Sequence, residues 1–352
     1  MSTIMKLKRK PKKITNMLTS FIIIENFFCI SRAFLIEKKR TKYFCNFVFF
    51  AVVALVVSAF IYDATNSEDS SSATLSIIET VLIVETIILS FSAIYASKSF
   101  EIFNALDDMC DFDKKSVSKY QSEVFSATVI TIAATIFDSI GLTLNSFKLS
   151  ALLILFIGSA AHDAELNFYA LLIRSINLRL TNLCKESPNV GSKIYGHILI
   201  TTTNMGHDFT LGVIVMLVVT FLKTIILTVY IMLFNTLSTT VTLYVVCREI
   251  KSLYTLCVLC SAASETTDIC RAISFDLTKK LIDETNTQRS MKSNHHKILT
   301  RWLSSVTSER PVYLSGRLLN IDFALPLLLI DLSINYLLII LQVGSNILYI
   351  KI

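Results

Sequence analysis

The 352-residue sequence has few of the residues that interrupt regular structure, with only 8 glycines and 4 prolines. So few turn-forming residues exclude a collagen-like chain, a loop-rich β-sandwich and a disordered tail. Charged residues make up only 17% of the chain and hydrophobic residues 53%, whereas soluble proteins usually carry about 25% charged residues. Roughly two soluble domains would fit the length, but the polar surface that they need is missing. The composition therefore predicts a polytopic membrane protein of the all-α class.

Motifs for catalysis, cofactor binding and nucleic-acid binding are also missing. The chain has no Walker loop, no G-x-S-x-G or H-E-x-x-H sequence and no dinucleotide fingerprint. We therefore expect neither an enzyme nor a bound cofactor. The net charge of +6 is accompanied by no RNA- or DNA-binding motif, so we expect contact with anionic membrane lipid and no nucleic-acid partner.

The cysteines and histidines give no pattern typical of a disulfide framework or a metal site. None of the 8 cysteines falls in a predicted outer loop, so no structural disulfide is expected. Cys257 and Cys260 form a lone C-x-x-C sequence, which without a second pair or a nearby histidine does not predict zinc binding. We interpret His295 and His296 as a solvated pair in a polar stretch, and we expect no bound metal.

What the sequence does contain is a series of long apolar runs. A transmembrane helix needs about 20 largely apolar residues, and in lipid a helix satisfies its backbone hydrogen bonds internally. The sixth run is the weakest, because Arg248, Glu249 and Lys251 interrupt it. Seven transmembrane helices are predicted, at about residues 43–62, 75–96, 124–144, 149–173, 209–233, 237–262 and 323–350.

A further apolar stretch, Met17–Ile36, lies within the basic N-terminal segment 1–42. It contains Glu25, Asn26 and Arg32, and clusters of lysine and arginine flank it on both sides. A membrane span normally carries its positive flank on the cytoplasmic side only, whereas this stretch has positive charge at both ends. We therefore interpret it as an interfacial or re-entrant helix. A cleaved signal peptide is the alternative, but no small-residue cleavage site follows the apolar core.

The distribution of positive charge predicts the orientation. With seven spans and the N-terminus inside, only Lys148 and Lys351 lie outside, and Lys223, Arg248 and Lys251 lie within spans. Every other lysine and arginine falls in a cytoplasmic segment, in agreement with the positive-inside bias. We expect a plasma-membrane protein with its C-terminus outside and with helical cytoplasmic extensions, including the segment 263–322.

Charged residues within the predicted spans are candidates for function, because charge inside a membrane is costly. Spans two to six all carry charge, whereas span one carries none. These groups either face a shared polar cavity that binds a small ligand or pair with one another between helices, as Lys223 could with Asp163. The candidate ligand-binding residues are Glu79, Glu85, Asp138, His162, Asp163 and Lys223.

The last span carries a narrow polar stripe. At 100° per residue, the stripe comprises Asp331, Asn335, Leu338, Gln342, Ser345, Asn346 and Tyr349. One such helix cannot enclose a pore, but several copies around an axis can. Leu338 and Val343 would then narrow the path, with a ring of Gln342 beside them and a cation-attracting ring of Asp331 nearer the cytoplasm. Packing of the stripe against other helices through hydrogen bonds is the alternative.

The same span resembles a family signature. Asn335-Tyr336, five apolar residues and then Gln342-Val343 are similar to the Thr-Tyr-(five apolar)-Gln-Phe signature of insect gustatory receptors, although Asn335 and Val343 depart from it. Gly316 to Asp322 resembles the family's approach to its last helix, and Phe168 to Asn182 its fourth-helix end. The resemblance implies a ligand-gated cation channel, homo- or heterotetrameric, with a tastant pocket among helices two to six and a pore lined by the last helix.

Three other classes were compared with this interpretation. A G-protein-coupled receptor also has seven spans, but it would place the N-terminus outside, against the charge distribution. A secondary transporter is disfavoured by the odd number of spans and the scarcity of helix-breaking glycine and proline. A membrane enzyme would have to use His162, Asp163 and Glu165, whose spacing does not place all three on one face of a helix.

Overall fold

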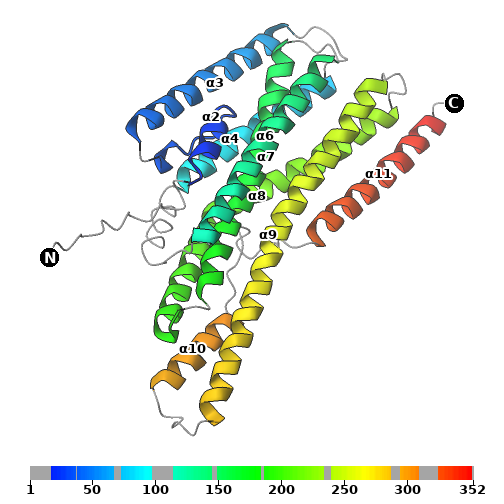
Figure 1. Ribbon diagram of the computed structural model, residues 1–352. Helices are drawn as coiled ribbons and strands as arrows, with labels where there is room; N and C mark the ends of the chain where they lie inside the picture. The colour runs from blue at the N-terminus through cyan, green and yellow to red at the C-terminus, as the bar shows by residue number, and fades with distance from the viewer. Residues whose placement is uncertain are drawn as a thin grey trace.

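The computed structural model describes residues 17–36, 38–66, 73–96, 114–144, 149–183, 186–233, 239–286, 294–308 and 324–350. Every regular element in these ranges is a helix, which confirms the all-α prediction for them. Two short helices come first, α2 (Thr19–Asn26) and the 3₁₀ helix η1 (Ala33–Leu35). Eight longer helices follow and account for most of the fold (Figure 1).

Seven long helices coincide with the seven predicted spans, although several extend well beyond them. They are α3 (Lys39–Asn66), α4 (Ala73–Tyr95), α6 (Lys114–Leu144), α7 (Leu149–Leu183), α8 (Pro188–Leu233), α9 (Thr239–Asn286) and α11 (Ala324–Ile350). At 1.5 Å per residue, the 48 residues of α9 extend about 70 Å, more than twice the thickness of a bilayer core of about 30 Å. The shorter α10 (Asn294–Ser308) lies between α9 and α11 in the chain.

Within the described ranges, two helices are both long and apolar enough to cross a membrane when judged by length and composition alone. Among the described residues, Lys39–Tyr62 and Ser116–Gly141 meet that test. A third span is possible if the two halves of a bent pair, Pro188–Gly206 and Leu211–Lys223, are taken together across their 52° bend. Thr80–Tyr95 of α4 and Ala324–Ile339 of α11 are apolar helices of shorter described length.

Helix α7 is the core of the fold. It packs against α3, α4, α6, α8 and α9, and every residue from 157 to 173 is buried. A helix that neighbours surround in this way carries His162, Asp163 and Glu165 into the interior. Helix α3, in contrast, lies at one edge of the bundle (Figure 1), and aromatic side chains such as Phe47 and Phe50 are exposed along it.

The far ends of α8 and α9 are held together by α10 (Figure 1). The indole ring of Trp302 packs directly on Gly191, where a Cβ atom would lie only 2.4 Å from a ring carbon. Only glycine permits this close approach of α10 to α8. Elsewhere in the bundle, the Asn177 side chain on α7 donates a hydrogen bond of 2.9 Å to the carbonyl oxygen of Ala262 on α9 and so joins these two helices.

The N-terminal stretch 17–36, predicted as an interfacial or re-entrant helix, consists of the short helix α2, a turn and the 3₁₀ helix η1. Helix α2 covers only Thr19–Asn26, and the chain reverses at Cys29, whose φ of 60° is unusual for a residue with a side chain. Side chains of this stretch are buried against the bundle, Phe21 and Ile22 completely. With the chain reversed in this way, Glu25 and Arg32 are in contact.

Candidate functional site: a buried charged cluster

Lys251 on α9 is the centre of a charged cluster inside the bundle. Its ammonium group forms ion pairs with Asp138 of α6 and with Asp163 of α7, the second at 2.6 Å. Asp138 and Asp163 are 1% and 5% exposed. Three helices are thus joined through one cation, which offsets much of the cost of burying two carboxylates.

His162 extends the cluster to two further helices. Its Nδ1 atom lies 2.5 Å from a carboxylate oxygen of Glu85 on α4, and its Nε2 atom lies 3.1 Å from the hydroxyl of Thr220 on α8. A carboxylate in contact with one ring nitrogen fixes the orientation of the imidazole. The imidazole and both of its partners are buried.

Two more cations complete the cluster. Arg248, one helical turn before Lys251, donates a hydrogen bond to the hydroxyl of Ser159 on α7. Lys223 on α8 is buried and acts electrostatically on Asp163. Counting Glu85, Asp138 and Asp163 against Lys223, Arg248 and Lys251, the charges balance, so the cluster is electrically neutral without a ligand if His162 is uncharged.

The cluster still offers hydrogen-bond acceptors. Among the described residues, one carboxylate oxygen of Glu85 and one of Asp138 are buried and accept no hydrogen bond. Buried oxygens of this kind cost free energy unless a donor reaches them. They are therefore the two atoms of the cluster with the clearest capacity to bind the hydroxyl or amine of a polar ligand.

The structure brings together most of the residues that the sequence singled out as ligand-binding. Glu85, Asp138, His162 and Asp163 lie in one cluster, with Lys223 beside it. The side chain of Glu79 lies outside the described residues. The sequence did not single out Lys251, Arg248, Ser159 or Thr220 as site residues. The only available signal was the interruption of the sixth apolar run by charge.

The predicted pore residues are on α11, which packs against the bundle mainly through α8 and α9. Asp331, Asn335, Leu338 and Gln342 are all exposed in the single chain, and Leu338 is 50% exposed. The side chains of Val343, Ser345 and Asn346 lie outside the described residues. Within one chain, therefore, the described part of the polar stripe is not buried by packing against other helices.

A second buried network, which sequence reasoning did not find, anchors the N-terminal stretch. Arg32 forms ion pairs with Glu25, at 2.6 Å, and with Glu165 of α7, and all three side chains are fully buried. The Arg32 guanidinium also lies 3.7 Å from the ring centroid of Phe168, a favourable cation–π contact. Glu25 and Arg32 were recognised only as polar residues that argued against a membrane span.

Solved structures with the same fold are found, but their sequences are very different from this one. No family model matches the chain, and no curated protein sequence matches it. The solved structure of the insect olfactory receptor OR5 from Machilis hrabei in complex with eugenol is similar, with a TM-score of 0.64, 11% identity and coverage of 94% of this chain and 97% of that one. The structure of the same receptor described without eugenol has a TM-score of 0.64 and 13% identity, with coverage of 93% and 97%. The chain therefore has the fold of an insect olfactory receptor.

Proposed function

We propose that this chain is a subunit of a gustatory-type chemosensory receptor, a ligand-gated cation channel of the plasma membrane. In this proposal several subunits, most simply four copies of this chain or a mixture with related receptors, surround one pore lined by α11. A small-molecule tastant opens the pore. The fold shared with an insect olfactory receptor and the signature residues Tyr336 and Gln342 support this function.

The observation that carries the channel proposal is the exposure of the polar stripe. Asp331 and Asn335 are exposed on a helix that is mostly apolar. Polar side chains on a membrane helix require water or another polar surface, because lipid cannot satisfy them. Further copies of α11 around an axis would supply both a polar surface and a water-filled path.

The charged cluster supports a polar ligand over an apolar one. Eugenol is bound by the similar olfactory receptor, but the cluster presents ionised side chains and two unsatisfied carboxylate oxygens, on Glu85 and Asp138. A ligand with several hydroxyl or amine groups would satisfy these atoms, whereas a hydrocarbon would leave them unpaired. Neutralising Glu85 or Asp138 should therefore shift the half-maximal ligand concentration and leave single-channel conductance unchanged.

The orientation is proposed with the N-terminus inside and the C-terminus outside, because nearly all positive charge then lies in the cytoplasm. Epitope tags provide the test. A tag after Ile352 should be accessible on intact cells, whereas a tag at residue 290 should become accessible only after permeabilisation. The reverse pattern would refute this orientation.

Whole-cell recording separates the channel from the alternatives. A cation current that a tastant evokes in cells whose G-protein signalling is blocked would support the channel. A response that disappears with the block would support a G-protein-coupled receptor, and saturating flux at low turnover would support a transporter.

A substitution at Leu338 tests whether such a current passes through a pore lined by α11. An apolar constriction can stop ions by dewetting, so Leu338→Ala should raise the ligand-independent current. Leu332→Ala is the matched control, because Leu332 is also an exposed leucine of α11 and, at 100° per residue, lies about 120° around the helix from Leu338. Equal currents in both variants, at equal surface expression, would remove α11 from the pore.

A further inference from the structure

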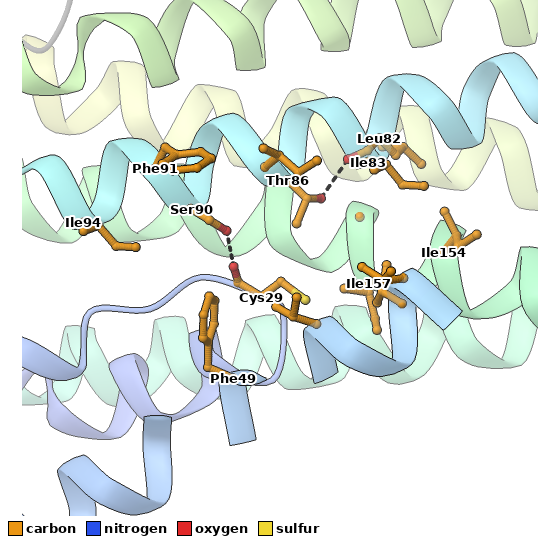
Figure 2. A pocket seen from close by; sticks show the side chains of 15 residues that line it. Cys29, Phe49, Leu82, Ile83, Thr86, Ser90, Phe91, Ile94, Ile154 and Ile157 are labelled. Carbon is orange, nitrogen blue, oxygen red and sulfur yellow. Dashed lines mark hydrogen bonds between the residues drawn. The ribbon is translucent and has the colours of Figure 1, made fainter. Parts of the chain in front are cut away.

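An apolar cavity lies at the edge of the bundle, away from the residues of the charged cluster. It has a volume of about 270 Å³ and is enclosed by α3, α4, α7 and the turn at Cys29 (Figure 2). Phe49 and Val53 face it from α3, Leu82 and Phe91 from α4, and Ile157 from α7. None of the described residues that line the cavity is charged.

The polar groups in the wall are already satisfied. The hydroxyl of Thr86 donates a hydrogen bond of 2.7 Å to the carbonyl oxygen of Leu82, and the hydroxyl of Ser90 donates to the carbonyl oxygen of Cys29 (Figure 2). The wall therefore offers little to water. Even an apolar cavity of about 150 Å³ stays dry and takes up apolar molecules, and an empty void forfeits dispersion contacts. The chemistry of the cavity indicates a hydrocarbon occupant.

The position of the cavity indicates where that hydrocarbon comes from. One wall is α3, whose segment Lys39–Tyr62 is long and apolar enough to cross a membrane. The outward face of α3 is exposed and rich in aromatic side chains, including Phe47 and Phe50. In a bilayer this face lies against lipid chains, so the nearest source of hydrocarbon is the membrane itself.

Positive charge at the start of α3 indicates which lipid. Lys38, Lys39, Arg40 and Lys42 are all exposed there, and each basic residue near an anionic membrane surface contributes about 1 kcal/mol of attraction. At 1.5 Å per residue, Lys42 and Val53 are separated by about 16 Å along α3. This matches half the thickness of a bilayer core, about 15 Å, which is the depth that one acyl chain spans.

We propose that the cavity binds one acyl chain of an anionic phospholipid and that the basic residues at the start of α3 bind its headgroup. The lipid would fill the space between α3, α4 and α7 and would contact the turn at Cys29. This site is separate from the proposed ligand cluster and pore, and it does not depend on the chain being a channel.

Filling the cavity from α3 is the most direct test. A larger residue at Gly158, which lies in the α7 wall, would not be a clean test. Its Cβ atom would lie 2.8 Å from the Cβ of Leu82 and would push α4 away from α7. Val53→Phe instead adds volume from the α3 side. Leu55→Phe is the matched control, because Leu55 is 53% exposed on the same helix and does not line the cavity.

The full chain is reconstituted in vesicles of equal parts phosphatidylcholine and phosphatidylserine, extracted in mild detergent, and its retained phospholipid is quantified by mass spectrometry. The unaltered protein and Leu55→Phe should retain phosphatidylserine in preference to phosphatidylcholine. Val53→Phe should retain several-fold less of it, and replacing the four basic residues with glutamine should abolish the preference. Equal retention of both lipids by the unaltered protein, or retention unaffected by Val53→Phe, would overturn the proposal.

A second measurement applies if Val53→Phe fails to fold. A tryptophan at position 49 reports on the cavity, and a tryptophan at position 50 reports on the lipid-facing surface, because Phe50 is 68% exposed. Phosphatidylserine with brominated acyl chains should quench both Phe49→Trp and Phe50→Trp. After transfer to unbrominated phosphatidylcholine, quenching should persist at position 49 and disappear at position 50. Simultaneous loss at both positions would refute a bound chain.

Discussion

Tyr336 on α11 packs edge-on against Phe221 on α8, with ring centroids 5.4 Å apart and ring planes at 85°. The residue before Phe221, Thr220, contacts His162 of the charged cluster. Two successive residues of α8 therefore contact the candidate ligand site and the candidate pore helix. A movement of α8 caused by a ligand in the cluster would reach α11 through this ring contact.

The ring contact predicts an effect of Tyr336 on gating. An aromatic pair of this geometry contributes about 0.5–1.5 kcal/mol beyond its buried area, which corresponds to roughly a two- to tenfold change in an equilibrium. Tyr336→Ala should change the ligand-independent current by about this factor, whereas Tyr336→Phe keeps the ring and should have little effect. Currents normalised to surface expression provide the measurement. If both variants behave alike, the ring contact does not couple the two helices.

The all-α class could be predicted from the sequence, because each long apolar run needs to be buried or to face lipid. It could not predict how the N-terminal stretch folds back. The ion pair between Arg32 and Glu165 joins residues 133 positions apart, and no local pattern indicates such a partner. Without knowledge of these partners, Glu25 and Arg32 indicate only that the stretch is too polar for a membrane span.

The charged cluster was predicted in part for a related reason. The cost of burying charge indicates that Asp138 and Asp163 need either a ligand or partners on other helices, and Lys223 is one partner that the sequence suggests for Asp163. The structure assigns Lys251 to both carboxylates. Its contacts depend on how α6, α7 and α9 pack against one another, which hydropathy along a single helix does not specify.

Lys251 should therefore be critical for stability. Lys251→Met removes the cation that pairs with the buried carboxylates of Asp138 and Asp163. Removing one partner of a buried ion pair typically lowers the free energy of unfolding by about 3–5 kcal/mol. Lys280→Met is the matched control, because Lys280 forms an exposed ion pair of 2.7 Å with Asp276, and such pairs contribute about 0–1 kcal/mol. Thermal unfolding of the purified chain should show a large loss for Lys251→Met and little change for Lys280→Met.

A rescue experiment distinguishes charge imbalance from lost packing. Adding Asp138→Asn to Lys251→Met removes one of the uncompensated charges, so the double variant should recover part of the lost stability. No recovery would indicate that the aliphatic part of Lys251, and not its charge, is what the fold requires.

Asp331 should influence ion selectivity. It is exposed near the start of α11, where several copies would form a negative ring. Asp331→Asn should lower the preference for divalent over monovalent cations, measured from reversal potentials, because a ring of carboxylates attracts divalent cations most strongly. Gln342→Ala should alter conductance more than ligand sensitivity. Asp268→Asn, an exposed carboxylate on α9, is the control and should leave selectivity unchanged.

The N-terminal anchor should make stability depend on pH. Burial raises the pKa of Glu25 from its ordinary value of 4.5 to about 8, against the attraction of Arg32 and with added repulsion from Glu165. One cation between two carboxylates favours protonation of one of them. The folded chain thus binds a proton that the unfolded chain releases between these two pKa values, so this contribution to stability is present below about pH 4.5 and is lost as the pH rises through about 8.

Glu25→Gln tests this dependence, because glutamine can still accept a hydrogen bond from Arg32 but cannot ionise. The unfolding temperature of the unaltered chain should fall as the pH is raised from mildly acidic to mildly alkaline, by an amount that corresponds to a few kcal/mol at most. The fall should be much smaller in Glu25→Gln. Glu123→Gln is the control, since Glu123 is partly exposed and its ion pairs, at 3.9 Å, are long, and it should keep the full dependence. Parallel curves for the unaltered chain and Glu25→Gln would show that Glu25 is ionised in the folded protein throughout this range.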